Sequence, residues 1–117
     1  MRFLLPMGNI TGNAAFTGEW PLPVPFACRI IEVWITDSDG IAADNTDYVD
    51  MDITGTTGYD SRAANQGALT ADTPIKLTLS PGAVVLAAGS QVKAVLAKGG
   101  SGKATEMGIT WVLETAN

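Results

Sequence analysis

The chain of 117 residues has no histidine and a single cysteine, Cys28. Without histidine, it has no histidine general base, histidine metal ligand or histidine pH switch of its own. One cysteine cannot form an internal disulfide or a cysteine-based zinc site. Cys28 lies in the apolar run PFACRIIEVWI. We interpret it as a small buried thiol rather than a reactive one, because cysteine is among the most buried residue types.

Charged residues are also scarce, at 16% of the chain, and the net charge is −5. The seven basic residues are scattered from Arg2 to Lys103. They form no cluster of the kind that binds nucleic acid or an acidic membrane surface, so we expect neither partner. The apolar content of 46% argues against disorder, and no apolar run is long enough for a transmembrane helix. We expect one compact domain.

Helical periodicity is missing, whereas an alternation with a period of two residues recurs. In residues 48–53, Val49, Met51 and Ile53 point one way, and Asp50 and Asp52 point the other way. Residues 75–79, 91–97 and 107–114 alternate in the same manner. Such alternation is typical of antiparallel strands with one buried face. With glycine-rich turns between roughly seven or eight such strands, the pattern predicts an all-β antiparallel sandwich.

Two segments carry more specific expectations. The longest strand candidate is 27–37, where strict alternation puts Ile30 and Trp34 on one face and Val33 on the other. Both faces are therefore apolar, which predicts a central strand or one covered by a neighbouring subunit. The GGSG segment at 99–102 predicts a hairpin turn between the strands that flank it.

The segment WPLPVPF at 20–26 breaks the strand pattern with three prolines. Prolines cannot donate to a ladder, so this segment is not a central strand, and we expect an extended, polyproline-like conformation. It is either a stiff lead-in to the next strand or an apolar arm that lies on a partner. We predict that residues 1–24 form an N-terminal strand or extended arm, and that residues 25–117 form the single sandwich domain.

Candidate chemistry is sparse. The acidic loop DSDGIAADNTD contains Asp37 and Asp39 but departs from the EF-hand spacing, so we interpret it as solvated, with a weak cation site left open. GGSGKAT lacks the glycine and the hydroxyl residue of a phosphate loop, because Ala97 and Ala104 stand at those positions. A serine nucleophile has no histidine partner, and no G-x-S-x-G occurs. We predict no catalytic residue, no metal and no cofactor.

The three tryptophans allow a further alternative. Trp20, Trp34 or Trp111 could provide a stacking platform for a sugar. Trp111, however, alternates in phase with Met107 and Ile109, which indicates the core, and we favour structural roles for all three. The apolar surface that remains, with little charge to interrupt it, indicates assembly or docking onto a larger surface.

Several segments carry a resemblance to a known family. They are the opening strand PFACRIIEVWI, the loop IAADNTDYVDMDI, the stretch VVLAAGSQVKAVLAKGGSG and the closing strand MGITWVLE. From about Pro25 to Glu114, the chain resembles the small jelly-roll decoration, or cement, proteins of tailed-phage heads. The resemblance implies an eight-stranded jelly roll that is often trimeric. The apolar run in MRFLLPMGN, at the N-terminus, is too short for a signal-peptide core, so we expect synthesis in the host cytoplasm. The resemblance also implies a place on the outer capsid surface, where the protein clips major capsid subunits together without catalysis.

On this hypothesis the partners are the major capsid protein and further copies of the chain, with a trimer favoured. The predicted contact residues lie near the N-terminus and in the proline segment: Phe3, Leu4, Leu5, Trp20, Leu22, Val24 and Phe26. The alternative is a lectin-like or receptor-binding jelly-roll module of a phage fibre or spike.

Overall fold

The computed structural model describes residues 1–12 and 17–115, and these residues form nine strands and no helix. None of them therefore belongs to a helix that could cross a membrane. The strands are β1 (Arg2–Gly12), β2 (Gly18–Pro23), β3 (Cys28–Asp37), β4 (Tyr48–Ile53), β5 (Tyr59–Asp60), β6 (Ile75–Lys76), β7 (Val85–Leu86), β8 (Gln91–Gly99) and β9 (Thr105–Thr115).

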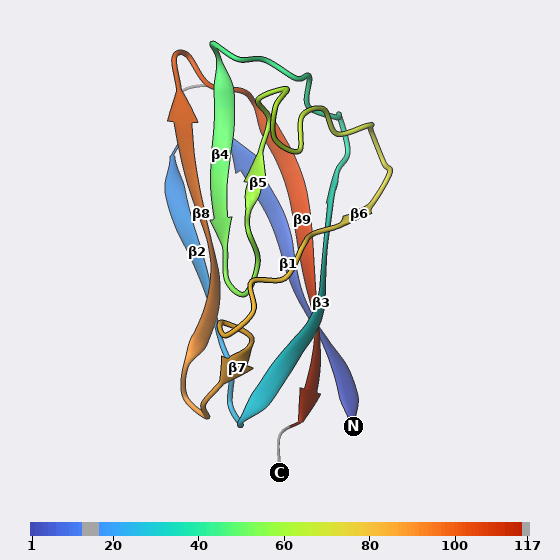
Figure 1. Ribbon diagram of the computed structural model, residues 1–117, viewed down its shortest axis with the longest axis vertical. Coiled ribbons are helices and arrows are strands. Elements are labelled where there is room, and N and C mark those ends of the chain that lie inside the picture. Colours follow the sequence, from blue (N-terminus) through green and yellow to red (C-terminus); the bar gives the residue numbers. More distant parts are fainter. Residues whose placement is uncertain (13–16, 116–117) are drawn as a thin grey trace.

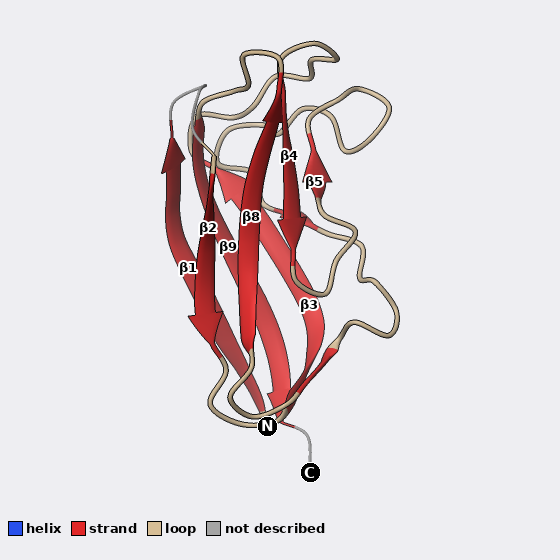
Figure 2. Cartoon of the chain, turned by 90° about the vertical axis from the view of Figure 1, so that its left-hand side faces the viewer, coloured by secondary structure: helices blue, strands red, loops and turns tan. Residues whose placement is uncertain are grey.

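The strands form two antiparallel sheets. One sheet has the order β1-β9-β3-β6, with β7 pairing to the start of β3, and the other has the order β2-β8-β4-β5. Figure 2 shows the four-stranded sheet in front of β9 and β3. Buried apolar side chains from both sheets form one cluster between them. The all-β sandwich predicted from the alternation is confirmed.

The pairs are nested along the chain. β1 pairs with β9, β2 with β8, β3 with β6 and β7, and β4 with β5. The first half of the chain therefore folds back along the second half. Two further pairings, β3 with β9 and β4 with β8, join the nested pairs into sheets. The two ends of the described chain lie at the same end of the sandwich (Figure 1), where the Thr115 N–H donates to the Met1 carbonyl over 3.0 Å.

The extended N-terminal arm is not confirmed. β1 pairs with β9 and β2 pairs with β8, so residues 2–12 and 18–23 belong to the two sheets. The exposed area is 6069 Å², close to the roughly 6,000 Å² of a compact monomer of this mass. Pro21 and Pro23 fit into β2 because this strand lies at a sheet edge and has a neighbour on one side only.

The predicted alternation is confirmed where strands have well-formed partners. In β4, Val49, Met51 and Ile53 are buried while Asp50 and Asp52 are exposed. In β8 and β9, the core-facing residues are Val92, Ala94, Leu96, Met107, Ile109, Trp111 and Leu113. Cys28 is fully buried, as expected, and burial raises the pKa of its thiol.

Strict alternation was wrong in β3. The register against β9 shifts between Ile30 and Glu32, so Ile31 is an extra residue in a β-bulge. The bulge brings both Ile30 and Val33 onto the core face, where they are 1% and 0% exposed. Trp34 consequently points outward and is 36% exposed.

The hairpin predicted at 99–102 was also wrong. The segment does make a turn, with Gly100 and Gly102 at φ 58° and 70°. However, β8 belongs to the four-stranded sheet and β9 to the five-stranded sheet. The turn is therefore a crossing between sheets, and the Ser101 N–H donates to Oδ1 of Asp47 over 2.8 Å to hold it.

Two glycines with nearly the same backbone conformation provide a test of this packing. Gly58 has φ 84° and Gly82 has φ 88°. A Cβ at Gly58 would collide with the carbonyl oxygen of Met51, whereas a Cβ at Gly82 would meet nothing within 4 Å. We expect Gly82→Ala to lower the free energy of unfolding by about 1 kcal/mol through backbone strain alone, and Gly58→Ala by about 3 kcal/mol or more.

Urea unfolding of both variants at the same pH measures this difference. Equal destabilisation of the two variants would contradict the position of β5 against β4.

Candidate functional site

The predicted contact residues of β2 face the core. Trp20 and Leu22 are partly buried and pack against the apolar cluster, and Val24, just after the strand, is 1% exposed. These three side chains therefore build the sandwich. The alternation of proline with apolar residues, which suggested an arm, instead places prolines outward and apolar residues inward on an edge strand.

The remaining predicted contact residues divide between two places. Phe3 and Leu5 are partly buried on the core side of β1, whereas Leu4 points outward and is 64% exposed. Phe26, in the β2–β3 connection, is 43% exposed, and its ring centroid lies 5.0 Å from that of Phe3. Together with Met1, which is 89% exposed, Phe3 and Phe26 make up what we call the apolar end.

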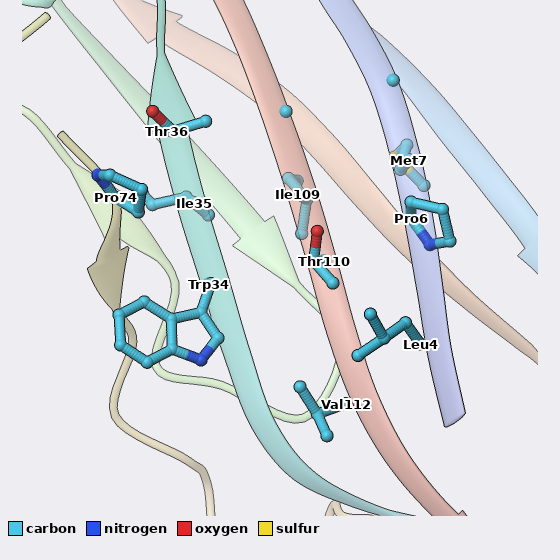
Figure 3. A pocket seen from close by; sticks show the side chains of 12 residues that line it. Leu4, Pro6, Met7, Trp34, Ile35, Thr36, Pro74, Ile109, Thr110 and Val112 are labelled. Atoms are coloured by element: carbon cyan, nitrogen blue, oxygen red, sulfur yellow. The ribbon is translucent and has the colours of Figure 1, made fainter. Parts of the chain in front are cut away.

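A second apolar surface lies on the outward side of β1, β9 and β3, and we call it the outer sheet face. It contains a hollow of about 440 Å³. Figure 3 shows Leu4, Trp34 and Val112 around this hollow, on three different strands. Thr36, Thr110 and Gly108 contribute small side chains or none. The hollow exists because the outward positions of these strands carry small residues.

The outward residues of the three strands line up in five rows across the sheet. From the apolar end upward, they are Arg2–Glu114–Arg29, Leu4–Val112–Glu32, Pro6–Thr110–Trp34, Gly8–Gly108–Thr36 and Thr11–Glu106–Ser38. The register of β1 against β9 shifts between Met7 and Ile10, and we assign Gly8 to the fourth row because it follows the core-facing Met7 and lines the hollow together with Gly108. The first row carries two arginines and one glutamate, a net charge of +1, and the fifth row carries one glutamate, a net charge of −1. The second row also carries Glu32, on its β3 side. The outer sheet face is thus basic at one end and acidic at the other, and its middle rows are uncharged apart from Glu32.

Hydrogen bonds organise the acidic end. The buried carboxylate of Asp37 accepts from the N–H groups of Asp39, over 3.0 Å, and Glu106, over 2.9 Å. Ser38 donates its hydroxyl to Glu106 over 2.8 Å, which lowers the pKa of Glu106. A hydrogen bond with Glu106, and then its negative charge, raises the pKa of Asp39. Both oxygens of Asp37 are thus engaged by backbone N–H groups.

No three acidic or cysteine side chains in the described part of the chain gather closely enough to hold a metal ion. The weak cation site considered at Asp37 and Asp39 gains no support from this geometry. The two residues instead join the loop after β3 to the start of β9.

The opposite outer face, on the four-stranded sheet, is polar. Lys93 and Glu19 form an ion pair of 3.2 Å across β8 and β2. The Arg62 guanidinium lies 4.3 Å from the ring centroid of Tyr48, and its Nε donates to both oxygens of Asp60 over 3.0 Å. These hydrogen bonds lower the pKa of Asp60. The four-stranded sheet therefore carries charged groups on its outer face, whereas the outer sheet face has its apolar side chains gathered between two charged ends.

Buried polar side chains serve the fold. Tyr59 donates its hydroxyl to the Gly67 carbonyl over 2.7 Å, and burial raises the pKa of Tyr59. Ser61 Oγ accepts from the Val49 N–H over 3.0 Å, and Thr105 Oγ1 donates to the Ile10 carbonyl over 3.0 Å. Every buried side-chain nitrogen or oxygen in the described residues has such a partner. These groups join loops to strands and strands to one another.

The tryptophans differ in exposure. Trp111 is fully buried and donates Nε1–H to the Thr54 carbonyl over 3.0 Å, which confirms its structural role. Trp34 lies on the outer sheet face, where its Nε1–H donates to Glu32 over 3.4 Å. The Lys76 ammonium lies 5.9 Å from its ring centroid. Sequence reasoning favoured a structural role for Trp34, with a sugar platform as the alternative, and did not place it on this face.

Comparisons of the chain with protein-family models, with curated proteins and with solved structures find no match. The function is therefore argued from the two apolar surfaces themselves.

Collisional quenching of fluorescence by acrylamide tests the outward position of Trp34. Trp111 is fully buried and Trp20 is partly buried, whereas Trp34 is the most exposed of the three. We expect Trp34→Phe to remove most of the quenchable emission from dilute protein, while Trp20→Phe leaves most of it in place. If the two variants were quenched equally, the outward orientation of Trp34 would be wrong.

Proposed function

We propose that this protein is a jelly-roll decoration protein, which binds the outer surface of a phage head and stabilises the shell by bridging major capsid subunits. A jelly roll is a long antiparallel hairpin of eight strands wrapped into two sheets. The nested pairs, β1 with β9 through β4 with β5, support this topology, with β6 and β7 sharing the place beside β3.

The apolar end is the observation that carries the proposal. Met1 and Phe26 expose apolar area to water at one end of the sandwich, and the ring of Phe3 packs against the ring of Phe26. Burial of the exposed part of Phe26 contributes about 1–2 kcal/mol, at about 25 cal/mol per Å². Such a contact is weak by itself. It suits a protein that meets many identical sites on a shell, where bridging two subunits at once multiplies the affinity.

The proposal places the protein on the outside of the virion, after synthesis in the host cytoplasm. Its partner is the major capsid protein, and two of the predicted contact residues, Phe3 and Phe26, lie in the capsid-binding end. Leu4 lies on the outer sheet face, and the other four predicted residues serve the sandwich. The proposal does not include the trimer that the family resemblance implies.

One observation favours a second candidate, a sugar-binding module of a phage fibre or spike. The exposed indole of Trp34 has a carboxylate, Glu32, and an ammonium, Lys76, beside it. Sugars stack on such rings and hydrogen-bond to such groups. The residues around Trp34 are mostly apolar, however, which favours a protein surface as the partner. Selective binding to a glycan array, lost in Trp34→Ala, would favour the module.

Co-sedimentation with heads of the virus that carries this sequence tests the decoration role. We expect wild-type protein to bind the heads and Phe26→Asp to bind at least tenfold more weakly, because a carboxylate cannot be buried there without a partner. A point variant is preferable to a deletion of residues 1–24, which would remove β1 and β2 from the sandwich.

Ala68→Asp is the matched control. It adds the same charge at an exposed position in the loop between β5 and β6, at the opposite end of the sandwich. We expect its binding to equal that of the wild type. Thermal unfolding of both variants verifies that they fold. Failure of the wild type to bind heads, or equal binding by Phe26→Asp, would overturn the proposal.

A further inference from the structure

We propose that the outer sheet face binds the same face of a second copy of this chain. The two copies are related by a two-fold axis that lies between their facing five-stranded sheets and runs perpendicular to the strands. This contact goes beyond the decoration role, because it uses a surface separate from the apolar end. An axis in this direction reverses the strands of one copy relative to the other and keeps β1 over β1 and β9 over β9.

The shape of the face is complementary to itself under this axis. With the axis over the third row, the second row of each copy faces the fourth row of the other. Leu4, which is 64% exposed, then lies over Gly8 of the other copy, and Val112 lies over Gly108. The two projecting side chains of one copy thus meet the two positions without side chains in the other. Two contacts of each kind form, as a two-fold axis requires.

The glycines of the fourth row are not needed for the packing of a single chain. A Cβ at Gly8 would meet nothing within 4 Å, and a Cβ at Gly108 would find its nearest atoms, from Met7 and Thr36, at 3.9 Å. Neither glycine has a positive φ. The fold of the single chain therefore leaves unfilled space above the two glycines. The projecting side chains of the second row, Leu4 and Val112, can fill this space in the other copy.

The charges select the direction of the axis. Reversal of the strands brings the first row, with its net charge of +1, over the fifth row of the other copy, with its net charge of −1. Glu106 then faces Glu114 of the other copy, and the guanidinium groups of Arg2 and Arg29 on either side of Glu114 supply two attractions against this one repulsion. An axis along the strands would instead place the first row over the first row and the acidic row over the acidic row, which is unfavourable.

The third row lies on the axis. It brings the two Trp34 side chains next to each other, so that aromatic rings which are 36% exposed in the single chain lose contact with water. Lys76 and Glu32, which form an ion pair of 3.9 Å beside Trp34, remain at the margin of the contact. The charged groups therefore surround an apolar centre, as in most protein interfaces.

The area predicts a weak contact. Each outward position of a sheet occupies roughly 33 Å², from a strand spacing of about 4.8 Å and a two-residue repeat of about 6.8 Å. Five rows on three strands then give roughly 500 Å² on each copy, or about 1,000 Å² in total. This value lies at the lower limit for specific interfaces. We expect a reversible dimer that forms as the concentration rises, and whose two apolar ends point in opposite directions.

Sedimentation equilibrium over a wide range of protein concentration tests the contact. We expect the mass to rise from that of one chain to that of two, and Trp34 to become protected from acrylamide over the same range. Leu4→Asp should lower the association constant at least tenfold. The matched control Thr57→Asp, in the exposed loop between β4 and β5, should leave it unchanged.

Gly108→Val separates the contact from any effect on folding. A Cβ has room at this position in the single chain, and valine suits a strand, so the thermal stability of this variant should equal or exceed that of the wild type. It nevertheless fills the space that Val112 of the other copy needs, and we expect association to weaken at least tenfold. A protein that stays monomeric at every concentration, that forms trimers, or that associates normally as Leu4→Asp and Gly108→Val, would overturn the proposal.

The outcome is distinguishable from that of the decoration role. Leu4→Asp should still bind heads, whereas Phe26→Asp should still form dimers. Loss of both activities in either variant would mean that the two surfaces are not separate and would overturn this assignment.

Discussion

The pairing of β9 with both β1 and β3 is the interaction on which the rest of the structure depends. β9 lies between these two strands in the five-stranded sheet. Its inward residues, among them Trp111 and Leu113, fill the centre of the core. Its outward residues, Gly108, Thr110 and Val112, form the floor of the hollow on the outer sheet face. One strand thus builds the stability of the sandwich and the surface that we propose for self-association.

The sequence predicted the fold class and much of the core, because alternation in 48–53, 91–97 and 107–114 depends only on one buried face. It could not predict the bulge at Ile31, because an extra residue is defined only against the partner strand. It could not show that the turn at 99–102 crosses between sheets, since turn residues do not specify which sheet the next strand joins. The arm was inferred from prolines that in fact belong to an edge strand.

The candidate site was predicted only in part, for a physical reason. The contact residues were predicted from large apolar side chains. Most of these side chains, such as Trp20 and Val24, fill or pack against the core instead. The outer sheet face is instead distinguished by small residues beside a few projecting apolar ones, because Gly8 and Gly108 lie two rows from Leu4 and Val112. Gly108 and Thr110 looked like ordinary outward positions, and only the register of β1, β9 and β3 brings them together with Leu4 and Trp34.

The prolines of the edge strands have one more consequence. An open sheet edge offers free N–H and C=O groups to any passing strand, which is how β-proteins aggregate or add a peptide by augmentation. β1 contains Pro6 and β2 contains Pro21 and Pro23, and the strands on the other margins, β5, β6 and β7, are two residues long. Lateral growth of either sheet into a fibril is therefore discouraged, and a protein rich in strands can reach high concentration while its copies meet only through side chains.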